Sequence, residues 1–437
     1  MSDPVKILEL KENLVNFVYD DEGAIATALE SYAAQKGKKN SYGIKQQNLT
    51  VDLFLTQGEV EDRTPLDLFI QQTDLLLEDK TIVQRWQHNF IGLFEIQAIE
   101  ADSYRLMNWL TAKTYKVYAH SEIPDKEKSR WQPGEIILCI IAPLNETEWF
   151  FFSDRIIKGR LSQPKLAVAI GEFKDNYPES LYADAPELLE EAWKSVEVYH
   201  REFVDYMGSD CITLPGYKLN QKISELQQMM SQKKLEEAGI DSSKSLGELL
   251  EESGQTEEDL TDAAADFGMD AEGVAKIVKD KSKSMVMPKI DLPPEIKQAE
   301  LVTVYSEPKW GQMFLPNHEK FTNLLAEDDP ATVENVNLLV KKYLELPEAN
   351  YYVWQQLKQA YPQGLEKLLQ NYLEQPFSLE TDLDSLLLQY DKSATPELPA
   401  IASVPIHLNN LFEAAIAQVQ KTKSKTKKKK KKGFLKP

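Results

Sequence analysis

Five short runs of β-branched and aromatic residues between residues 90 and 152 constrain the fold of this chain more than any other feature. Turn-forming sequences, such as Ala101-Asp102-Ser103 and Pro133-Gly134, separate the runs. Short strands at this spacing are typical of small all-β units. We therefore expect a small β-barrel or curled antiparallel sheet, built from the runs Phe90–Ile99, Tyr104–Leu110, Tyr115–Ala119, Ile136–Ala142 and Trp149–Phe152.

The fourth of these runs, Ile136–Ala142, is apolar at every position. A strand with one solvent-facing side alternates apolar and polar residues, whereas an unbroken apolar run is typical of a strand that is buried on both faces. The Pro133-Gly134 turn just before it marks where the strand begins. We therefore expect this strand at the centre of the sheet.

Outside the β-rich region, apolar residues recur at steps of three and four, which is the spacing of one helical face. Residues 5–18 have this spacing, and a stripe from Leu189 to Met207 predicts a helix of about six turns. Thr64 followed by Pro65 has the form of an N-cap and a first helical residue. Helices are therefore expected on both sides of the sheet.

The fold class predicted from these patterns is α+β, with a small β-barrel or curled antiparallel sheet flanked by helices, a separate all-α C-terminal domain and a disordered polybasic tail. The proline-containing stretch 281–295 marks the clearest boundary. The expected parts are a mainly helical region (1–85), the barrel or curled sheet (86–183), long amphipathic helices (184–240), an acidic helical subdomain with a linker (241–298), an α-helical domain (299–420) and the polylysine tail (421–437).

Charge is segregated along the chain. Residues 421–437 hold ten lysines and no acid, so the formal net charge of −20 for the whole chain leaves −30 for residues 1–420. A run of like charges stays solvated and binds polyanions through counterion release, without reading a sequence. The polyanion-binding residues expected here are Lys427, Lys428, Lys429, Lys430, Lys431 and Lys432.

The common catalytic motifs are missing from the sequence. It has no glycine-rich phosphate loop, nucleophile elbow, HExxH helix or EF-hand loop, and its five histidines are widely scattered. Cys139 lies in an apolar run and Cys211 follows a Gly-Ser-Asp turn, so two reduced thiols are favoured over one long-range disulfide. We expect no cofactor and no metal site.

Glu197 and His200 have the Glu-x-x-His spacing that di-metal helix bundles use. Such a site needs a second copy of the motif, and the sequence has none. The preferred interpretation is a histidine at the edge of an amphipathic helix, with its polar side hydrogen-bonded.

One catalytic alternative remains in the stretch 149–174. Asp154 follows an aromatic strand, and Glu172 and Lys174 follow the apolar run Leu166–Ile170, which we interpret as the next strand. This arrangement resembles the magnesium-binding site of PD-(D/E)xK nucleases. The resemblance implies that the two carboxylates hold the metal and that the lysine orients a water molecule for attack on phosphate.

Aromatic residues on the predicted barrel invite comparison with platforms on which single-stranded nucleic acids stack their bases. Such platforms also need a basic groove, and acids outnumber bases around these residues. Core packing and cross-strand pairing are therefore the favoured roles for Tyr104, Trp109, Tyr115, Tyr118 and Trp149.

No stretch reaches the roughly 20 apolar residues of a membrane span, and Glu9 and Glu12 interrupt the first apolar residues. A cytoplasmic protein without a transmembrane segment is expected. The preferred function is a non-catalytic interaction or assembly protein that binds protein partners and is tethered to an anionic surface, such as ribosomal RNA, by its lysine tail. The alternatives are the nuclease-like enzyme and a peripheral membrane protein recruited by the tail.

Overall fold

The computed structural model describes residues 4–37, 44–100, 102–119, 131–237, 285–286, 290–327, 335–412 and 414–415. The chain forms two compact units. Unit 1 combines Met1–Leu189 with His407–Pro437, and unit 2 is Glu190–Ile406. This division differs from the predicted one because the boundary falls inside a long helix and the residues after Ile406 group with the barrel.

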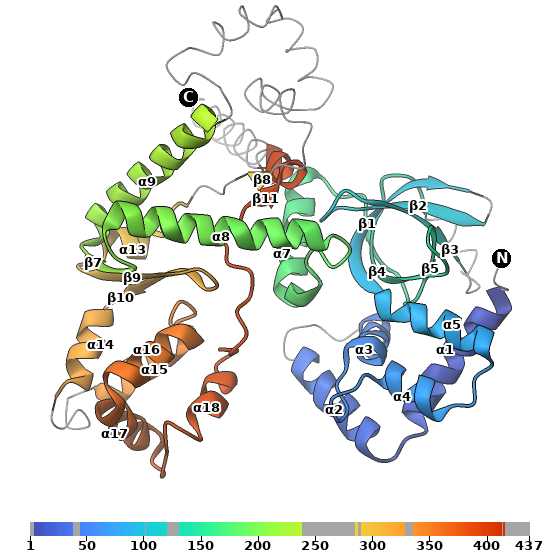
Figure 1. The fold of residues 1–437 in the computed structure, drawn as a ribbon, viewed down its shortest axis with the longest axis horizontal. Helices are drawn as coiled ribbons and strands as arrows, with labels where there is room; N and C mark the ends of the chain where they lie inside the picture. The colour runs from blue at the N-terminus through green and yellow to red at the C-terminus, as the bar shows by residue number, and fades with distance from the viewer. Residues whose placement is uncertain are drawn as a thin grey trace, which may run out of the picture. The chain divides into compact units, whose positions relative to one another are not determined.

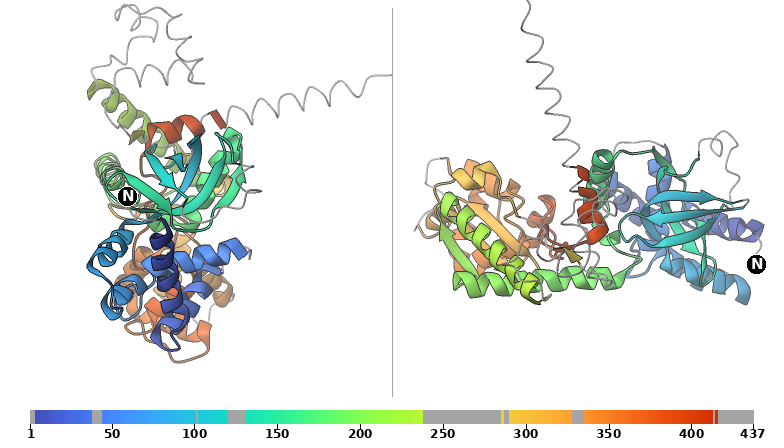
Figure 2. Two further views of the ribbon diagram at one scale, coloured as in Figure 1. Left: turned by 90° about the vertical axis from the view of Figure 1, so that its right-hand side faces the viewer. Right: turned by 90° about the horizontal axis from the view of Figure 1, so that it is seen from above.

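Five strands of unit 1 form a closed barrel in the order β1-β2-β3-β5-β4, and β4 also pairs with β1. The β3–β5 pair is parallel and the other pairs are antiparallel. The mixed α and β class with a small barrel is thereby confirmed. The strands are β1 (Phe90–Ile99), β2 (Ser103–Asn108), β3 (Thr114–Tyr118), β4 (Ile136–Pro143) and β5 (Glu148–Phe151), and they curve around one axis in Figures 1 and 2.

All eight residues of β4 are buried. The strand pairs with β1 along one edge, and with β5 and β6 (Ile156–Gly159) along the other. Its unbroken apolar sequence therefore reflects burial on both faces, as predicted. The barrel interior is filled by buried side chains that include Phe94, Leu106 and Ile137.

Helices cover the barrel within unit 1 (Figure 1). In the first helix, Ile7, Leu10 and Leu14 face the interior, as their spacing predicts. Thr64 caps the fourth helix through a capping box with Asp67, and Pro65 follows at its first turn. The helices are α1 (Pro4–Tyr19), α2 (Ala24–Gly37), α3 (Ile44–Gln57), α4 (Pro65–Gln72), α5 (Leu77–Arg85), η1 (Trp86–His88), α7 (Gln163–Asn176) and η2 (Pro178–Ser180).

Unit 1 is completed by residues from the far end of the chain. Residues 406–412 and 414–415 are helical, and Leu408 and Leu411 are buried. His407 donates from Nε2 to the backbone carbonyl of Trp109 at 2.9 Å. Helix α8 (Pro186–Met207) begins in unit 1 and continues into unit 2.

Unit 2 is built around a three-stranded antiparallel sheet in the order β10-β9-β7. Helices α8 and α9 lie along one face of the sheet, and α14 to α17 along the other (Figure 1). Its elements are β7 (Cys211–Leu214), α9 (Gly216–Glu237), β8 (Met285–Val286), α13 (Pro294–Gln298), β9 (Val302–Glu307), β10 (Gly311–Pro316), α14 (His318–Leu325), α15 (Val336–Glu345), α16 (Tyr351–Ala360), α17 (Pro362–Leu373), α18 (Leu383–Gln389) and β11 (Val404–Pro405).

The predicted C-terminal helices are present, but the expectation that this part is entirely helical is corrected by the β9–β10 hairpin. In β10, buried and half-buried residues alternate, because Met313 and Leu315 enter the helical core while their neighbours face the other way. Among the described residues, no helix combines the length and the apolarity needed to cross a bilayer.

Candidate functional site

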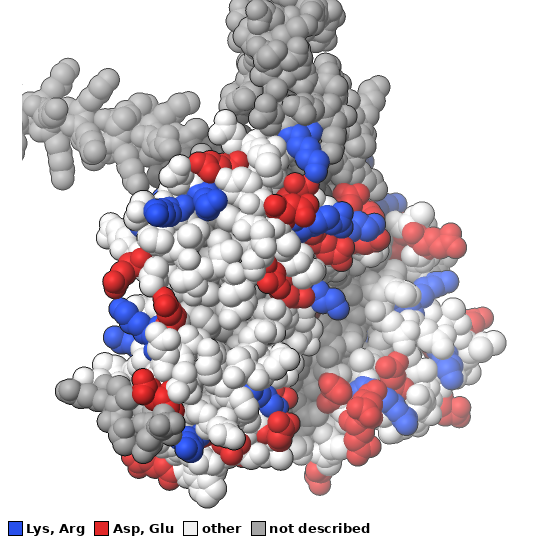
Figure 3. Space-filling model, turned by 60° about the vertical axis from the view of Figure 1, so that its left-hand side comes forward, with Lys and Arg blue, Asp and Glu red and all other residues white. Residues whose placement is uncertain are grey.

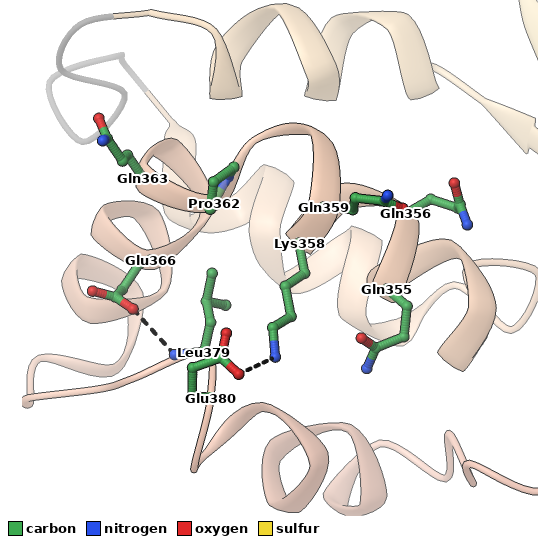
Figure 4. A pocket seen from close by; sticks show the side chains of 9 residues that line it. All are labelled: Gln355, Gln356, Lys358, Gln359, Pro362, Gln363, Glu366, Leu379 and Glu380. Carbon is green, nitrogen blue, oxygen red and sulfur yellow. Dashed lines mark hydrogen bonds and ion pairs between the residues drawn. The ribbon is translucent and has the colours of Figure 1, made fainter.

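An open groove of about 480 Å³ lies on unit 2 between α16, α17 and the loop that leads to α18 (Figure 4). Its size is within the range of ligand pockets. Uncharged amide side chains dominate its lining. The lining residues are Gln355, Gln356, Lys358, Gln359, Pro362, Gln363, Glu366, Leu379 and Glu380.

The local sequence explains why α16 and α17 present this face. The Asn350 side chain caps α16 by accepting from the Val353 N–H at 3.2 Å. Pro362 begins α17 directly after α16 ends. Leu357 and Leu365 turn into the core, so the glutamines on the opposite sides of both helices face outwards.

Glycine at position 364 allows α17 to lie against the end of α14. A Cβ at this position would stand 2.0 Å from the carbonyl oxygen of Leu325. No side chain larger than hydrogen fits between these two backbones. This close approach fixes the position of α17 and therefore one wall of the groove.

The loop wall of the groove is held by side chains from both helices. Glu366 Oε2 accepts from the Leu379 N–H at 3.1 Å, and Lys358 Nζ lies 3.1 Å from Glu380 Oε2 (Figure 4). Outside the lining, Gln370 Nε2 donates to the Phe377 carbonyl at 2.8 Å. These contacts hold the loop before α18 against α16 and α17.

Three of the four groove glutamines have free amides. Gln356, Gln359 and Gln363 have no hydrogen-bond partner among the described residues, and Gln355 makes one long contact of 3.5 Å to Asp384. Each amide offers two donors and an acceptor oxygen. The groove can therefore form hydrogen bonds with a ligand without breaking any of its own at these three positions.

A second polar cluster of unit 2 is buried. His318 is 4% exposed, with Nδ1 hydrogen-bonded to the Tyr343 hydroxyl and Nε2 3.3 Å from the Tyr305 hydroxyl. Burial lowers the pKa of His318 to about 4 and raises the pKa of Tyr343. Burial also raises the pKa of Cys211, next to Tyr305, so this thiol is not activated for nucleophilic attack.

In unit 1, the carboxylate of Asp184 joins the segment before α8 to the barrel. Asp184 Oδ2 accepts from Asn108 Nδ2 at 3.1 Å, from Thr111 Oγ1 at 2.8 Å and from the Tyr115 hydroxyl at 2.5 Å. Lys113 bonds to the Asp184 backbone carbonyl and pairs with Glu187 at 2.9 Å. Burial raises the pKa of Tyr115, so its hydroxyl stays protonated as a donor.

The residues of the nuclease-like alternative do not have the predicted arrangement. Leu166–Ile170 belongs to helix α7, which corrects the strand interpretation, and Glu172 lies exposed on that helix, 3.8 Å from Lys158. Asp154 follows β5 and accepts from Asn48 at 2.9 Å. Glu172 and Lys174, two apart on a helix, point to different sides, so no strand end presents them together.

His200 does not form part of a metal cluster in the structure. Its Nδ1 lies 3.1 Å from the Ser306 hydroxyl on β9, whereas Glu197 is exposed. Over the described ranges, no three His, Cys, Asp or Glu side chains group as metal ligands would. Cys139 and Cys211 are free thiols, the first buried and the second half-buried.

Most of the barrel aromatics belong to the core. Tyr104 packs edge-on against Trp131 at 4.7 Å, and Tyr115 packs against Trp149 at 5.2 Å. Trp109 and Tyr118 are half-buried and hydrogen-bond to glutamates through Nε1 and the hydroxyl, respectively.

The basic residues near these aromatic side chains are paired with acids. Arg105 lies 3.3 Å from Glu100, and Lys116 lies 3.5 Å from Glu148. On the face drawn in Figure 3, basic and acidic side chains are interspersed around a broad uncharged area. Neither the surroundings of these aromatic side chains nor the face in Figure 3 presents the continuous basic groove of a nucleic-acid platform.

Sequence reasoning did not single out the groove, although four glutamines occur within residues 355–363. The tail residues Lys427 to Lys432 lie outside the described part of the chain. No protein-family model, no curated protein and no solved structure matches this chain.

Proposed function

We propose that this protein is a non-catalytic interaction protein of the cytoplasm that binds a polypeptide partner through unit 2 and is held on an anionic surface, such as ribosomal RNA, by its lysine tail. The observation that carries the proposal is the groove with three free glutamine amides. An amide recognises another amide by donating and accepting at once, and polypeptide backbones present such groups in abundance.

The chemistry of the groove favours binding over catalysis. Its only ionisable side chains are Lys358, Glu366 and Glu380, and all three already contact a neighbour. Neither histidine nor a nucleophilic hydroxyl or thiol lines it. A general base beside a nucleophile, which hydrolytic sites require, is therefore missing from this groove.

The tether part of the proposal rests on charge and on where the lysines join the fold. Lys427 follows Ala415, the last described residue of unit 1, after eleven intervening residues. Because residues 1–420 carry a formal charge of −30, the ten lysines are the part of the chain suited to a polyanion.

The test compares the full-length protein with a chain that ends at Gln420. Both are applied to immobilised RNA and to vesicles containing anionic lipid, over a range of salt concentrations. The full-length protein should be retained on RNA, with an affinity that falls by about 0.7 logarithmic units per logarithmic unit of salt for each neutralised phosphate. The shortened chain should pass through.

Equal behaviour of the two chains would contradict the tether. Retention of the full-length protein on vesicles but not on RNA would instead identify a lipid surface as its anionic partner. Lysine-to-arginine replacement at Lys427 to Lys432 serves as the matched control, since it keeps the charge and should keep the retention.

A further inference from the structure

We infer that the glutamine-lined groove between α16 and α17 holds an extended polypeptide segment that carries a lysine or arginine side chain. The inference rests on the proposed function and adds to it the conformation and the charge of the bound segment. Three properties of the groove lead to it: the arrangement of its amides, the small number of apolar residues in its lining and its charge.

The free amides suit an extended backbone. Gln356 and Gln359 are three residues apart and therefore lie side by side in one row along α16, and Gln363 follows on the first turn of α17. An extended segment leaves backbone N–H and C=O groups unpaired on both of its sides. A helical segment has already paired these groups within itself, so it could not use the row of amides.

Few apolar residues line the groove. Leu379, at 4% exposure, and Pro362 are its only apolar lining residues. A partner that binds as an amphipathic helix needs a continuous apolar groove for its anchor residues at helical spacing. This groove has no continuous row of apolar residues. The contacts that it can offer are therefore mainly hydrogen bonds from its side-chain amides to the main chain of a partner.

The charge of the groove favours a cation. Two carboxylates, Glu366 and Glu380, face a single ammonium group, Lys358. Glu380 is 80% exposed on its side chain, so it can accept a ligand cation while it still contacts Lys358. An acidic or phosphorylated segment would be repelled, whereas a lysine or arginine would pair with these carboxylates.

The experiment selects ligands from a phage-displayed library of random octapeptides on the full-length protein. Before the selection, the library is passed over the triple variant Gln356→Ala, Gln359→Ala, Gln363→Ala. This variant still carries the lysine tail, so this step removes peptides that bind to the lysines. Selected peptides should contain lysine or arginine without apolar residues at helical spacing. As synthetic peptides they should bind the wild type at least about tenfold more tightly than the triple variant.

The control for the variant is Gln389→Ala, an exposed glutamine of α18 outside the groove, which should leave peptide affinity unchanged. Circular dichroism of the triple variant should match that of the wild type, because the three amides have no partner in the fold. Glu380→Gln should weaken the selected peptides severalfold and reduce the preference for a basic residue.

The inference is overturned if the selected peptides are acidic or carry apolar residues at helical spacing. It is also overturned if no selected peptide depends on the three glutamines for binding. These outcomes would leave the tail-dependent retention on RNA untouched, because that test compares chains with the same groove. If the full-length protein is not retained on RNA but still binds peptides through the three glutamines, the tether is contradicted and the inference about the groove stands.

Discussion

At the scale of single residues, specific hydrogen bonds hold together two polar clusters inside the fold of this protein. His318 hydrogen-bonds to two tyrosine hydroxyls, and Asp184 accepts three hydrogen bonds through one oxygen. Removing one member of such a group leaves the others buried and unsatisfied, which costs more than the hydrogen bond itself contributes. Polar chemistry in these clusters therefore serves the fold.

His318 makes the stability of the protein depend on pH. Burial lowers its folded pKa to about 4 from the ordinary 6.5, so the unfolded chain takes up a proton first as the pH falls. Protons therefore favour the unfolded state, and the free energy of unfolding should drop by up to about 1.4 kcal/mol per pH unit below about pH 6.5. Urea unfolding of unit 2 at a series of pH values measures this slope.

The variant His318→Gln isolates the contribution of the histidine, because every carboxylate that titrates in the same range remains. Its free energy of unfolding should fall less steeply between about pH 6.5 and pH 4 than that of the wild type. Identical slopes would mean that His318 binds its proton equally well in the folded and the unfolded chain.

At the scale of elements, two helical glycines have opposite roles. A Cβ on Gly364 in α17 would stand 2.0 Å from the carbonyl oxygen of Leu325. A Cβ on Gly171 in α7 would meet nothing within 4 Å. The close contact between α17 and α14 therefore requires glycine at position 364, whereas α7 does not require glycine at position 171.

Replacing each glycine with alanine should change stability in opposite directions. Gly171→Ala should raise the free energy of unfolding by about 0.5 to 1 kcal/mol, because alanine favours the helix. Gly364→Ala should lower it by more than that, because the backbones must separate. Thermal unfolding followed by circular dichroism measures both, and a stabilised Gly364→Ala variant would show that α17 moves freely.

The elements that sequence predicted well are those in which a second signal supports the pattern. The apolar run Ile136–Ala142 is rich in β-branched isoleucine and follows the Pro133-Gly134 turn, which favours a buried strand, and Thr64-Pro65 has the N-cap and proline that begin a helix. Leu166–Ile170 was ambiguous, because a short apolar run fits either structure. Its outcome as a helix was indicated by Ser162 and Pro164 just before it, which begin α7.

The sequence did not indicate the groove, because glutamine does not mark a site as titratable residues do. Its amides become a feature only when α16 and α17 bring them together and no protein side chain occupies them. Likewise, the β9–β10 hairpin lies among helical patterns. Its central strand β9 pairs with β10 and with β7, which lies about 90 residues earlier in the chain.

At the scale of the whole molecule, unit 1 is made from both ends of the chain and unit 2 from the middle. A chain that ends at Ile406 lacks His407, Leu408 and Leu411, and so exposes the surface around the Trp109 carbonyl. It should lose stability in unit 1 while unit 2 keeps its own.

Hydrogen exchange resolved by peptide measures this difference, since amides of β1 and β2 should exchange faster and those of α15 to α17 should not. The chain ending at Gln420 is the control, and its exchange should match the full-length protein over both units. Unchanged exchange of β1 and β2 in the shorter chain would show that the barrel is complete without the residues after Ile406.

The hydrogen bond between His407 and Trp109 joins residues that are 298 positions apart. During translation, at about 5 to 20 residues per second, the histidine is synthesised about 15 to 60 s after the tryptophan. The nascent barrel therefore waits for its last packing partner while the inserted unit emerges and folds. In that interval the apolar surface that Leu408 and Leu411 later cover stays exposed, and it closes only once these residues have been synthesised.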